Sequence, residues 1–473
     1  MLSKYLGDKP FWKSVTTLAL PMALQALLST SFTLVDTVMV GQLGDISLSA
    51  VGMAGQWSWL MVLVFVGICS GTGVFVSQYW GVGNVKGIRR VLGISTICVL
   101  AVSLIFFAVG AIYPRFVLKI FSNETPVIEE GIRYLRSASF SYIAIGLMNL
   151  FSTILRSVEI VKVPMYSSFV ASLINVVMNY SLIFGKFGLP EMGIKGAALA
   201  TCISSWTGLV ILLIISLKQK NILIGRIKDL FEFTKSEVAE FMRTAMPVVV
   251  NEGMWGLGTF TYNIIFGRLG YENYAAVTMV RTLQDLSFAI ISGLGAACCV
   301  IVGKSIGAGL INRGYNDSRR FAVLVPLISF VSGIIVIVFR NPFIRFFDMS
   351  GNMTAYTLKT TLAIIVIVGL EMAVRNVAYI NVVGIFRSGG DTKTGLKYDM
   401  ICLWGVSLPL TFLAAFVFKW SFPAVFATML IAEDVPKTVM CIRYFVSKKW
   451  IRPVTEEGKE ALKKLEDKNN GTD

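Results

Sequence analysis

The sequence contains no histidine and few charged residues. Of its 473 residues 15% are charged, against about 25% in an ordinary soluble domain. The missing histidine excludes a Ser-His-Asp triad, a Cys-His pair, a His-ligated metal and an imidazole pH switch. No metal-binding motif is present either, so we expect no enzyme and no cofactor. If the protein binds and releases protons, carboxyl groups must do so.

Apolar residues, in contrast, make up 55% of the chain, and the mean hydropathy is +0.71. A transmembrane helix needs about 20 mostly apolar residues, and about twelve such runs follow one another. The sequence therefore predicts an all-α polytopic membrane protein with 12 transmembrane helices. The runs lie at about 14–40, 49–79, 91–113, 132–155, 164–184, 194–217, 241–268, 275–303, 320–340, 357–386, 396–418 and 421–446.

The net charge of +15 comes from basic residues in the short breaks between these runs. With the N-terminus inside, about 29 Lys and Arg fall in inner loops and about 11 in outer loops, which follows the positive-inside rule. We therefore expect a multi-pass protein of the plasma (inner) membrane with both termini cytoplasmic, no cleaved signal peptide and no nucleic-acid partner. The seven cysteines lie in apolar runs and are interpreted as small apolar side chains.

The chain repeats itself at an offset of about 226 residues, with Pro21 matching Pro247 and "ILRS" matching "IFRS" further on. Such repeats are typical of transporters built from duplicated bundles. Paired glycines follow the same offset, among them Gly41/Gly267, Gly44/Gly270, Gly81/Gly307 and Gly83/Gly309. We predict an N-terminal six-helix bundle over 1–217, a cytoplasmic linker over 218–240, a C-terminal six-helix bundle over 241–446, and a charged, solvated cytoplasmic tail over 447–473.

Pro21 and Pro247 occupy equivalent places in the first helix of each half. A proline inside a helix removes one backbone hydrogen bond and kinks the helix. In lipid the freed carbonyl is tolerated only against protein or water. The two prolines are therefore candidate hinges, with inherited helix packing as the alternative.

Asp36 lies inside the first apolar run, with no basic neighbour on its own helix. A charge at that depth costs at least roughly 2.5–3.5 kcal/mol, so an intramembrane carboxylate is a candidate site by default. Asp36 could carry a proton, or hold Na⁺ as the anion, with Thr33 and Thr37 adding oxygens. The alternative is a hydrogen-bonded structural aspartate.

Asn175 and Asn179 are four residues apart, so they share one face of the fifth run. Their amide oxygens, next to a carboxylate, suit a hard cation such as Na⁺. Alone, such a pair is more often an interhelical hydrogen-bonding contact. The spacing along the chain does not say whether the pair lies near Asp36.

Glu252 lies in the seventh run, five residues after Pro247, and Trp255 follows one turn later. A carboxylate beside a tryptophan suits a cavity for organic cations. The alternative is a helix-end glutamate at the cytoplasmic interface. The repeat equivalents of Asp36 and Glu252 are Tyr262 and Ala26, so the two halves carry their acidic groups at different places.

Three opposite-charge pairs lie within spans at i,i+4: Arg281/Asp285, Glu371/Arg375 and Glu433/Lys437. Pairing lowers the cost of burying charge, so these pairs are expected to be structural. Asp285 and Glu371 are the better candidates for contact with a substrate or ion. Arg156 and Arg387, at equivalent places in the repeat, are interpreted as interface anchors.

The segments "VDTVMVGQLG", "SQYWGVGN", "INVVMNYSLIFGKFGLPEMGIKGAALAT" and "IFRSGGDTK" together resemble the MATE multidrug and toxic compound extrusion transporters, NorM-like branch, over about residues 13–450. The resemblance implies H⁺- or Na⁺-coupled antiport by rocking of two bundles. It places Asp36, Asn175 and Asn179 in an N-terminal cation site, where Na⁺ could bind, and Glu252 near the branch's seventh-helix glutamate. A tenth-helix carboxylate found in some members corresponds to Asn376 here.

The resulting hypothesis is a monomer that exports amphipathic, often cationic organic compounds by alternating access, in contact with membrane lipid. The candidate cation-coupling residues are Asp36, Asn175, Asn179 and Glu252, and the candidate substrate cavity contains Trp255, Gln284, Asp285, Glu371 and Asn376. A flippase for a lipid-linked or polysaccharide precursor is the alternative. A passive channel and a membrane-embedded enzyme are further alternatives.

Overall fold

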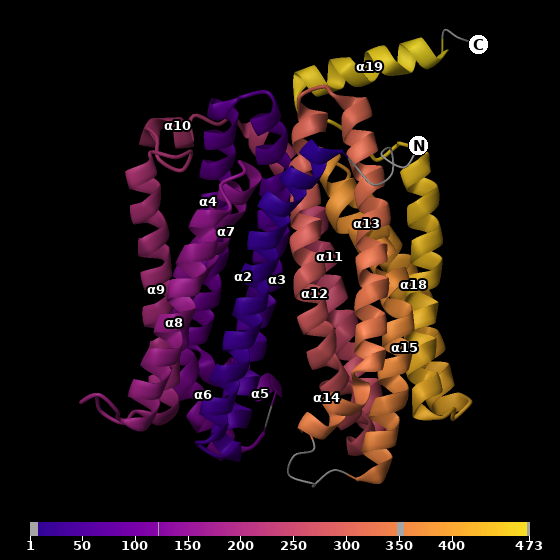
Figure 1. The fold of residues 1–473 in the computed structure, drawn as a ribbon. Helices are drawn as coiled ribbons and strands as arrows, with labels where there is room; N and C mark the ends of the chain where they lie inside the picture. Colours follow the sequence, from indigo (N-terminus) through magenta and orange to yellow (C-terminus); the bar gives the residue numbers. More distant parts are fainter. Residues whose placement is uncertain (1–7, 122, 348–353, 471–473) are drawn as a thin grey trace. The chain divides into compact units, whose positions relative to one another are not determined.

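The computed structural model describes residues 8–121, 123–347 and 354–470, and almost all of these residues are helical (Figure 1). Within these ranges, ten helices are long and apolar enough to cross a membrane. The predicted all-α polytopic class is confirmed. The count of twelve is not, because α11 (Lys235–Arg268) and α18 (Phe422–Val446) are not among the ten. In α18 three ionisable residues, Glu433, Asp434 and Lys437, interrupt the apolar run.

Two compact units make up the chain: unit 1 is Met1–Ala23 with Val250–Asp473, and unit 2 is Leu24–Val249. Two helices are shared between the units, α2 (Lys9–Gly41) and α11. Each is divided within two residues of its internal proline, Pro21 or Pro247. The bundle boundaries expected from the sequence leave α2 whole and fall within the first two turns of α11, at residues 240 and 241. The compact units instead divide both helices beside their prolines.

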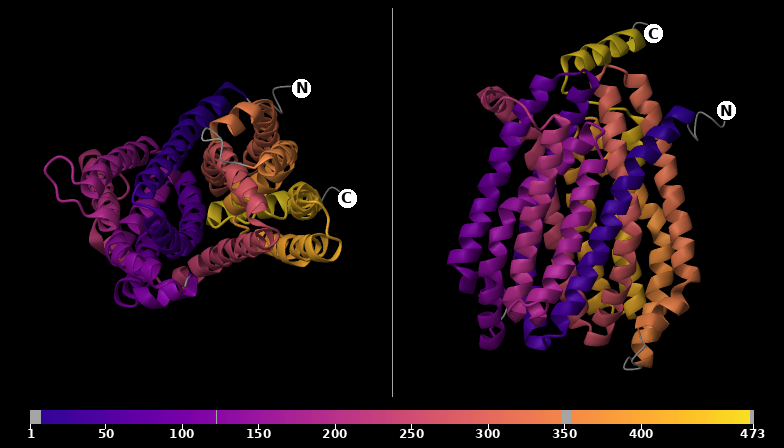
Figure 2. Two further views of the ribbon diagram at one scale, coloured as in Figure 1. Left: turned by 90° about the horizontal axis from the view of Figure 1, so that it is seen from below. Right: turned by 60° about the vertical axis from the view of Figure 1, so that its left-hand side comes forward.

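Unit 2 begins with the second part of α2, and the long helices that follow in the chain run alongside one another (Figure 2). Asn84 caps the start of α4 by accepting from the Gly87 N–H at 2.9 Å, and α8 ends at Gly185 in the left-handed conformation. The further elements of unit 2 are α3 (Asp45–Gly81), α4 (Val85–Ile112), α5 (Pro114–Phe121), α6 (Thr125–Ala138), η1 (Ser139–Ser141), α7 (Tyr142–Ser157), α8 (Lys162–Phe184), α9 (Gly193–Gln219) and α10 (Ile227–Phe231).

In unit 1, α13, α15 and α18 run side by side (Figure 1). Three segments, η2, η3 and η4, are π-helical, a rare form that often lies at functional sites. The elements after α11 are α12 (Tyr271–Gly307), α13 (Ile311–Val338), α14 (Arg340–Phe347), α15 (Ala355–Tyr379), η2 (Ile380–Phe386), α16 (Lys393–Asp399), η3 (Met400–Ser407), α17 (Leu408–Phe412), η4 (Leu413–Val417), α18 and α19 (Glu456–Asn470).

The predicted repeat is confirmed helix by helix. α3 and α12 both have 37 residues, α4 and α13 both have 28, and α5 and α14 both have 8. The turns between them also correspond, because Gly83 and its equivalent Gly309 have positive φ values of 69° and 74°. Glycine favours this conformation because it has no Cβ to clash with the backbone.

A second matched pair of glycines lies where the shared helices meet each unit. A Cβ on Gly67 would lie 2.5 Å from the Val249 Cα, and one on Gly293 would lie 2.7 Å from the backbone nitrogen of Ala23. These glycines, as expected, permit close helix contact. Val249 is the last residue of the part of α11 that belongs to unit 2, and Ala23 is the last residue of the part of α2 that belongs to unit 1. Both contacts therefore lie directly beside a boundary between the units.

The linker before α11 is held to α4. The Arg89 guanidinium pairs with Asp229 of α10 at 2.7 Å, and a Cβ on Gly93 would lie 1.8 Å from the Leu230 carbonyl oxygen. α11 begins with a capping box: the Thr234 N–H donates to the Glu237 carboxylate at 2.7 Å, and the Glu237 N–H donates to the Thr234 hydroxyl at 3.2 Å. The linker is thus folded onto unit 2.

The C-terminal segment is partly buried, contrary to the expectation of a solvated tail. Trp450 is 0% exposed and packs against Phe386 and Phe445. The Thr455 hydroxyl donates to the Gly307 carbonyl at 2.7 Å, and α19 lies across the ends of α12 and α13 (Figure 1). The many charged residues of this segment led to the expectation of a solvated tail, although Trp450 and Ile451 are buried.

Candidate functional site

Asp36 of α2 is joined to α8 by a hydrogen-bond chain in unit 2. The Asn179 amide nitrogen donates to the Asp36 carboxylate at 2.5 Å and to the Asn175 carbonyl oxygen at 3.1 Å. The Asn175 amide in turn donates to the Ser204 hydroxyl of α9 at 3.3 Å. The structure therefore brings together the three residues whose proximity the sequence could not establish.

Asn179 also has an unused acceptor. It is 0% exposed, and no donor in the described part of the chain reaches its carbonyl oxygen. Two acceptor oxygens therefore belong to this site, one from a carboxylate and one from an amide, and such oxygens suit a hard monovalent cation. The Thr33 and Thr37 hydroxyls instead donate to carbonyls of their own helix, at 3.0 and 2.9 Å.

Glu252 is ion-paired. Its carboxylate lies 2.9 Å from the guanidinium of Arg387, and both side chains are largely buried in unit 1. Arg387, interpreted from the sequence as an interface anchor, is buried and paired with a carboxylate. Arg156, its repeat equivalent, donates to the Ser152 carbonyl at 3.2 Å and the Thr153 hydroxyl at 3.4 Å within its own helix.

The predicted cavity residues lie in different surroundings within unit 1. Trp255 packs against the apolar core, Gln284 is half-buried and Asp285 is exposed. The Asn376 amide donates to the Met372 carbonyl of its own helix at 2.8 Å. The cavity stays a prediction.

Glu371 belongs to a cluster of ionisable side chains on α15 and α18 that the sequence revealed only in part. Arg375 lies near Glu371, Asp434 and Glu433. Lys437 forms its ion pair with Asp399, the last residue of α16, and not with Glu433 as predicted. Sequence spacing along α18 could not indicate a partner from another helix.

The comparisons with known proteins divide the chain into two repeats that begin at the two helix prolines. The MatE family model matches residues 21–181 and 247–413, so the two matches begin at Pro21 and Pro247. The chain belongs to the MatE family. The family match thus recognises the same repeat that the helix lengths show.

Several relatives extend over almost the whole MatE chain. "Probable multidrug resistance protein NorM" of Thermotoga maritima is 26% identical and covers 93% of this chain and 93% of the relative. "Uncharacterized transporter YisQ" of Bacillus subtilis is 24% identical over 94% of this chain and 96% of its own. A point mutant of VcmN, a MATE transporter of Vibrio cholerae, superimposes with a TM-score of 0.82 at 18% identity, covering 95% of this chain and 100% of that chain. The structural likeness shows the fold.

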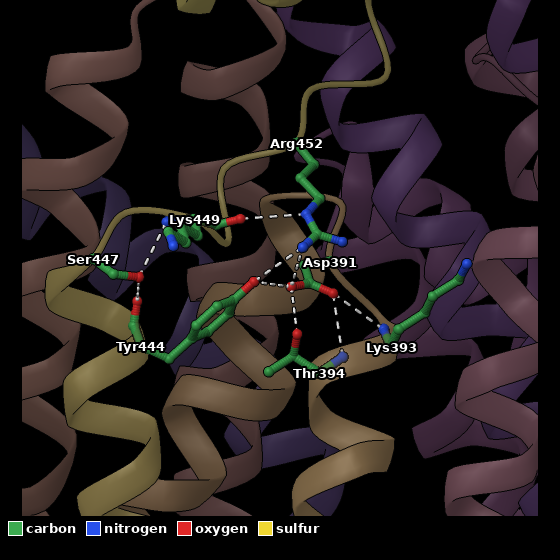
Figure 3. A network of polar contacts seen from close by, with 7 residues as sticks. All are labelled: Asp391, Lys393, Thr394, Tyr444, Ser447, Lys449 and Arg452. Atoms are coloured by element: carbon green, nitrogen blue, oxygen red, sulfur yellow. Dashed lines mark hydrogen bonds and ion pairs between the residues drawn. The ribbon is translucent and has the colours of Figure 1, made fainter. Parts of the chain in front are cut away.

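The MatE chain also contains a polar network that sequence reasoning missed, around Asp391 in the segment "IFRSGGDTK" (Figure 3). Its buried carboxylate accepts the N–H groups of Lys393 and Thr394, each at 3.2 Å, and thereby caps α16. It also accepts the Tyr444 hydroxyl at 2.5 Å and pairs with Arg452 at 3.6 Å. These contacts join the α15–α16 turn, α18 and the C-terminal segment, which indicates a structural role.

Proposed function

We propose that this MatE-family protein is a cation-coupled antiporter that exports amphipathic, often cationic organic compounds across the plasma membrane. The main support is the Asp36–Asn179–Asn175 chain: the carboxylate lies in a membrane helix, and its hydrogen-bond donor is the Asn179 amide and not a cationic side chain. The printed names of relatives, such as the NorM protein of Thermotoga maritima, support multidrug export.

Coupling follows from the charge of Asp36. In the outward-facing state the carboxylate takes up H⁺ or Na⁺, which removes its negative charge and weakens the bond from Asn179. Loss of this bond changes how the second part of α2 packs on α8, favours release of the organic cation and permits return to the inward-facing state. The two fluxes are coupled because the cation and the substrate have different affinities for the two states.

Efflux of ethidium-like cations from whole cells tests this proposal. Asp36→Asn keeps the size of the side chain and removes its charge, so efflux should fall to that of cells without the transporter. Thr33→Ala is the matched control, because that hydroxyl is bonded within its own helix. Efflux by Asp36→Asn at the wild-type rate, with equal amounts of protein in the membrane, would contradict the proposal.

Vesicles with imposed ion gradients identify the coupling ion. We expect either an H⁺ gradient alone or a Na⁺ gradient alone to drive accumulation of the organic cation. Accumulation that follows neither gradient would contradict antiport and support a passive channel. The orientation with both termini in the cytoplasm, supported by the distribution of Lys and Arg, is tested in the same vesicles by labelling cysteines placed in α19.

A further inference from the structure

The two halves of the repeat pack differently near the ends of α4 and α13. In unit 2, Trp57 of α3 packs against Phe106 of α4, with the two ring centroids 4.5 Å apart. The Trp57 indole N–H donates to the Phe106 carbonyl at 3.3 Å. A Cβ on Gly110 would lie 3.4 Å from the same indole nitrogen, so the glycine leaves room for the ring. Trp57 therefore fills the space between α3 and α4 at this level.

In unit 1 the same place holds smaller side chains. At the repeat offset of 226, the two aromatic residues correspond to Leu283 of α12 and Ser332 of α13, and the glycine corresponds to Val336. An open groove of about 350 Å³ lies here between α12, α13 and α14. Its lining consists of Leu283, Ile335, Val336, Phe339, Pro342 and Phe343. The groove thus lies where the second half of the repeat lacks two aromatic rings.

The groove opens on the apolar face of a membrane helix. Leu283, Val336 and Phe343 pack against the core of unit 1, whereas Ile335 is 52% and Phe339 59% exposed. These two residues continue a row of exposed apolar side chains along α13, which is long and apolar enough to span the membrane. The row consists of Leu327, Phe330, Val331, Ile334 and Val338. Lipid chains are as apolar as these side chains and cover such a face in the bilayer.

The lining of the groove suits a hydrocarbon chain. Pockets for small organic molecules are of similar size, about 300–1,000 Å³, but they contain a few placed polar groups that orient the ligand. All six side chains that line this groove are apolar. A flexible alkyl chain requires no polar partner, so the acyl chain of a lipid fits this lining better than a compound with polar groups.

The charge beside the groove indicates which lipid fits. The sequence of α14, RNPFIRFF, contains two arginines and no acidic residue. Arg340 directly follows Phe339, and Arg345 comes two residues after Phe343. α14 lies at the end of α13, where a membrane helix meets the headgroups (Figure 1). Guanidinium groups bind phosphate well, and two positive charges disfavour an organic cation at the same place.

We propose that this groove binds one acyl chain of an anionic phospholipid and that Arg340 and Arg345 bind its phosphate. The lipid occupies the place that Trp57 fills in unit 2, so the site results from divergence of the two halves of the repeat. The proposal concerns unit 1 and does not depend on the coupling role proposed for Asp36.

Native mass spectrometry of the purified full-length protein tests this site. The protein is titrated with phosphatidylglycerol or with phosphatidylcholine that has the same acyl chains. Leu283→Trp introduces the residue found at the equivalent place in unit 2 and fills the groove, so one tightly bound lipid should be lost with either headgroup. Arg340→Gln and Arg345→Gln should each weaken binding of phosphatidylglycerol roughly five-fold and leave binding of phosphatidylcholine unchanged.

Val338→Trp is the matched control. It introduces the same side chain on α13, at a position that is 66% exposed and does not line the groove, and should leave the bound lipid in place. The proposal is wrong if Leu283→Trp retains this lipid, if Val338→Trp loses it equally, or if the wild type binds both headgroups with equal affinity. Displacement of the lipid by ethidium would identify the groove as a site for exported compounds and would also contradict the proposal.

A second measurement uses the wild-type protein and so does not depend on variants that fold. Phosphatidylglycerol with a diazirine in its acyl chain is photolysed in vesicles that contain the protein. We expect peptide mapping to find the label on Leu283 or within residues 335–343, with labelling that saturates and is reduced by excess unlabelled phosphatidylglycerol. Labelling here that rises in proportion to the lipid and is not reduced would mean contact with bulk lipid only, and would contradict a bound lipid.

Discussion

A single amide group, that of Asn179, connects Asp36 to Asn175. Hydrogen bonds to a charged group contribute about 1.5–3 kcal/mol, and this one stabilises the ionised form of Asp36. Asn179→Ala should therefore change binding of the coupling ion by roughly 10- to 100-fold: H⁺ should bind more tightly, whereas Na⁺ should bind more weakly because the Asn179 carbonyl oxygen is also lost. Asn175→Ala should have a smaller effect, because Asn175 contacts Asn179 and not the carboxylate. The measurement is the concentration of H⁺ or Na⁺ that gives half-maximal efflux in vesicles. Equal effects of the two substitutions would argue against this order of contacts.

The ion pair between Glu252 and Arg387 leads to a prediction about stability. Removing one partner of a buried pair leaves the other charge uncompensated and costs about 3–5 kcal/mol. Glu252→Gln should therefore lower the thermal unfolding temperature in detergent, and the double substitution Glu252→Gln/Arg387→Gln should recover much of the loss. A coupling role for Glu252 predicts the opposite pattern, with efflux lost while the unfolding temperature is unchanged.

The sequence identified intramembrane acids well and their neighbours poorly. Asp36 and Glu371 could be found because charge is rare in apolar runs. The partners of Glu252 and Lys437, however, lie on other helices, and Arg387 is 135 residues from Glu252. Spacing along one helix predicts only partners at i,i+3 or i,i+4, so contacts of this kind require the fold.

At the scale of helices, Pro21 and Pro247 lie where α2 and α11 pass from one compact unit to the other. Alanine at either position restores a backbone N–H donor and stiffens the helix. We therefore expect Pro21→Ala and Pro247→Ala to slow efflux several-fold without loss of stability, as measured by initial rates and thermal unfolding.

Pro326 provides the matched control for these hinge substitutions. It also lies inside a long helix, α13, but that helix belongs to unit 1 over its whole length. Pro326→Ala should leave the efflux rate near that of the wild type. If all three substitutions slow efflux equally, the prolines act through general helix packing and not through a hinge.

The capping box of α11 predicts a pH-dependent contribution to stability. Burial raises the pKa of Glu237, but hydrogen bonds from the Thr234 N–H and from Arg90 outweigh it, so the pKa of Glu237 is lowered overall. A lowered pKa means that the folded state favours the ionised form, so its stabilisation is present at neutral pH and lost as the pH falls. Glu237→Gln should lower the unfolding temperature at pH ~7, with a difference that shrinks in acid.

Glu240→Gln is the control for this pH experiment, because it changes the charge equally at an exposed position one turn further along α11. Its unfolding temperature should follow that of the wild type across the pH range. A difference between Glu237→Gln and wild type that is independent of pH would mean that packing, and not ionisation, accounts for the effect.

Most membrane helices could be predicted from apolar run length, and the equal lengths of α3 and α12 follow from the repeat. The π-helical segments and α10 could not be predicted in this way. Hydropathy depends on composition and is insensitive to whether a backbone bond reaches four or five residues back. The five residues of α10 are held by contacts with α4, which the sequence of the linker alone does not show.

For the molecule as a whole, duplication accounts for the scaffold and divergence accounts for the sites. Both family matches begin at a proline, and the two halves of the repeat have equivalent glycine contacts. The acidic groups, in contrast, differ: unit 2 holds Asp36 with two asparagines, whereas unit 1 holds several carboxyl groups on α15, α16 and α18. A repeated fold therefore supports two chemically different ionisable sites.

The C-terminal segment extends this asymmetry, because Trp450 completes the core at one end of unit 1. Truncating a fully buried aromatic side chain costs about 3–5 kcal/mol, so Trp450→Ala should clearly lower the unfolding temperature of the protein in detergent. Trp420→Ala is the control, because Trp420 is 52% exposed and its truncation should cost about 0.5 kcal/mol or less. An unchanged unfolding temperature after deletion of residues 450–473 would mean that the segment does not stabilise unit 1. It would also mean that the Asp391 network holds the α15–α16 turn against α18 without Arg452.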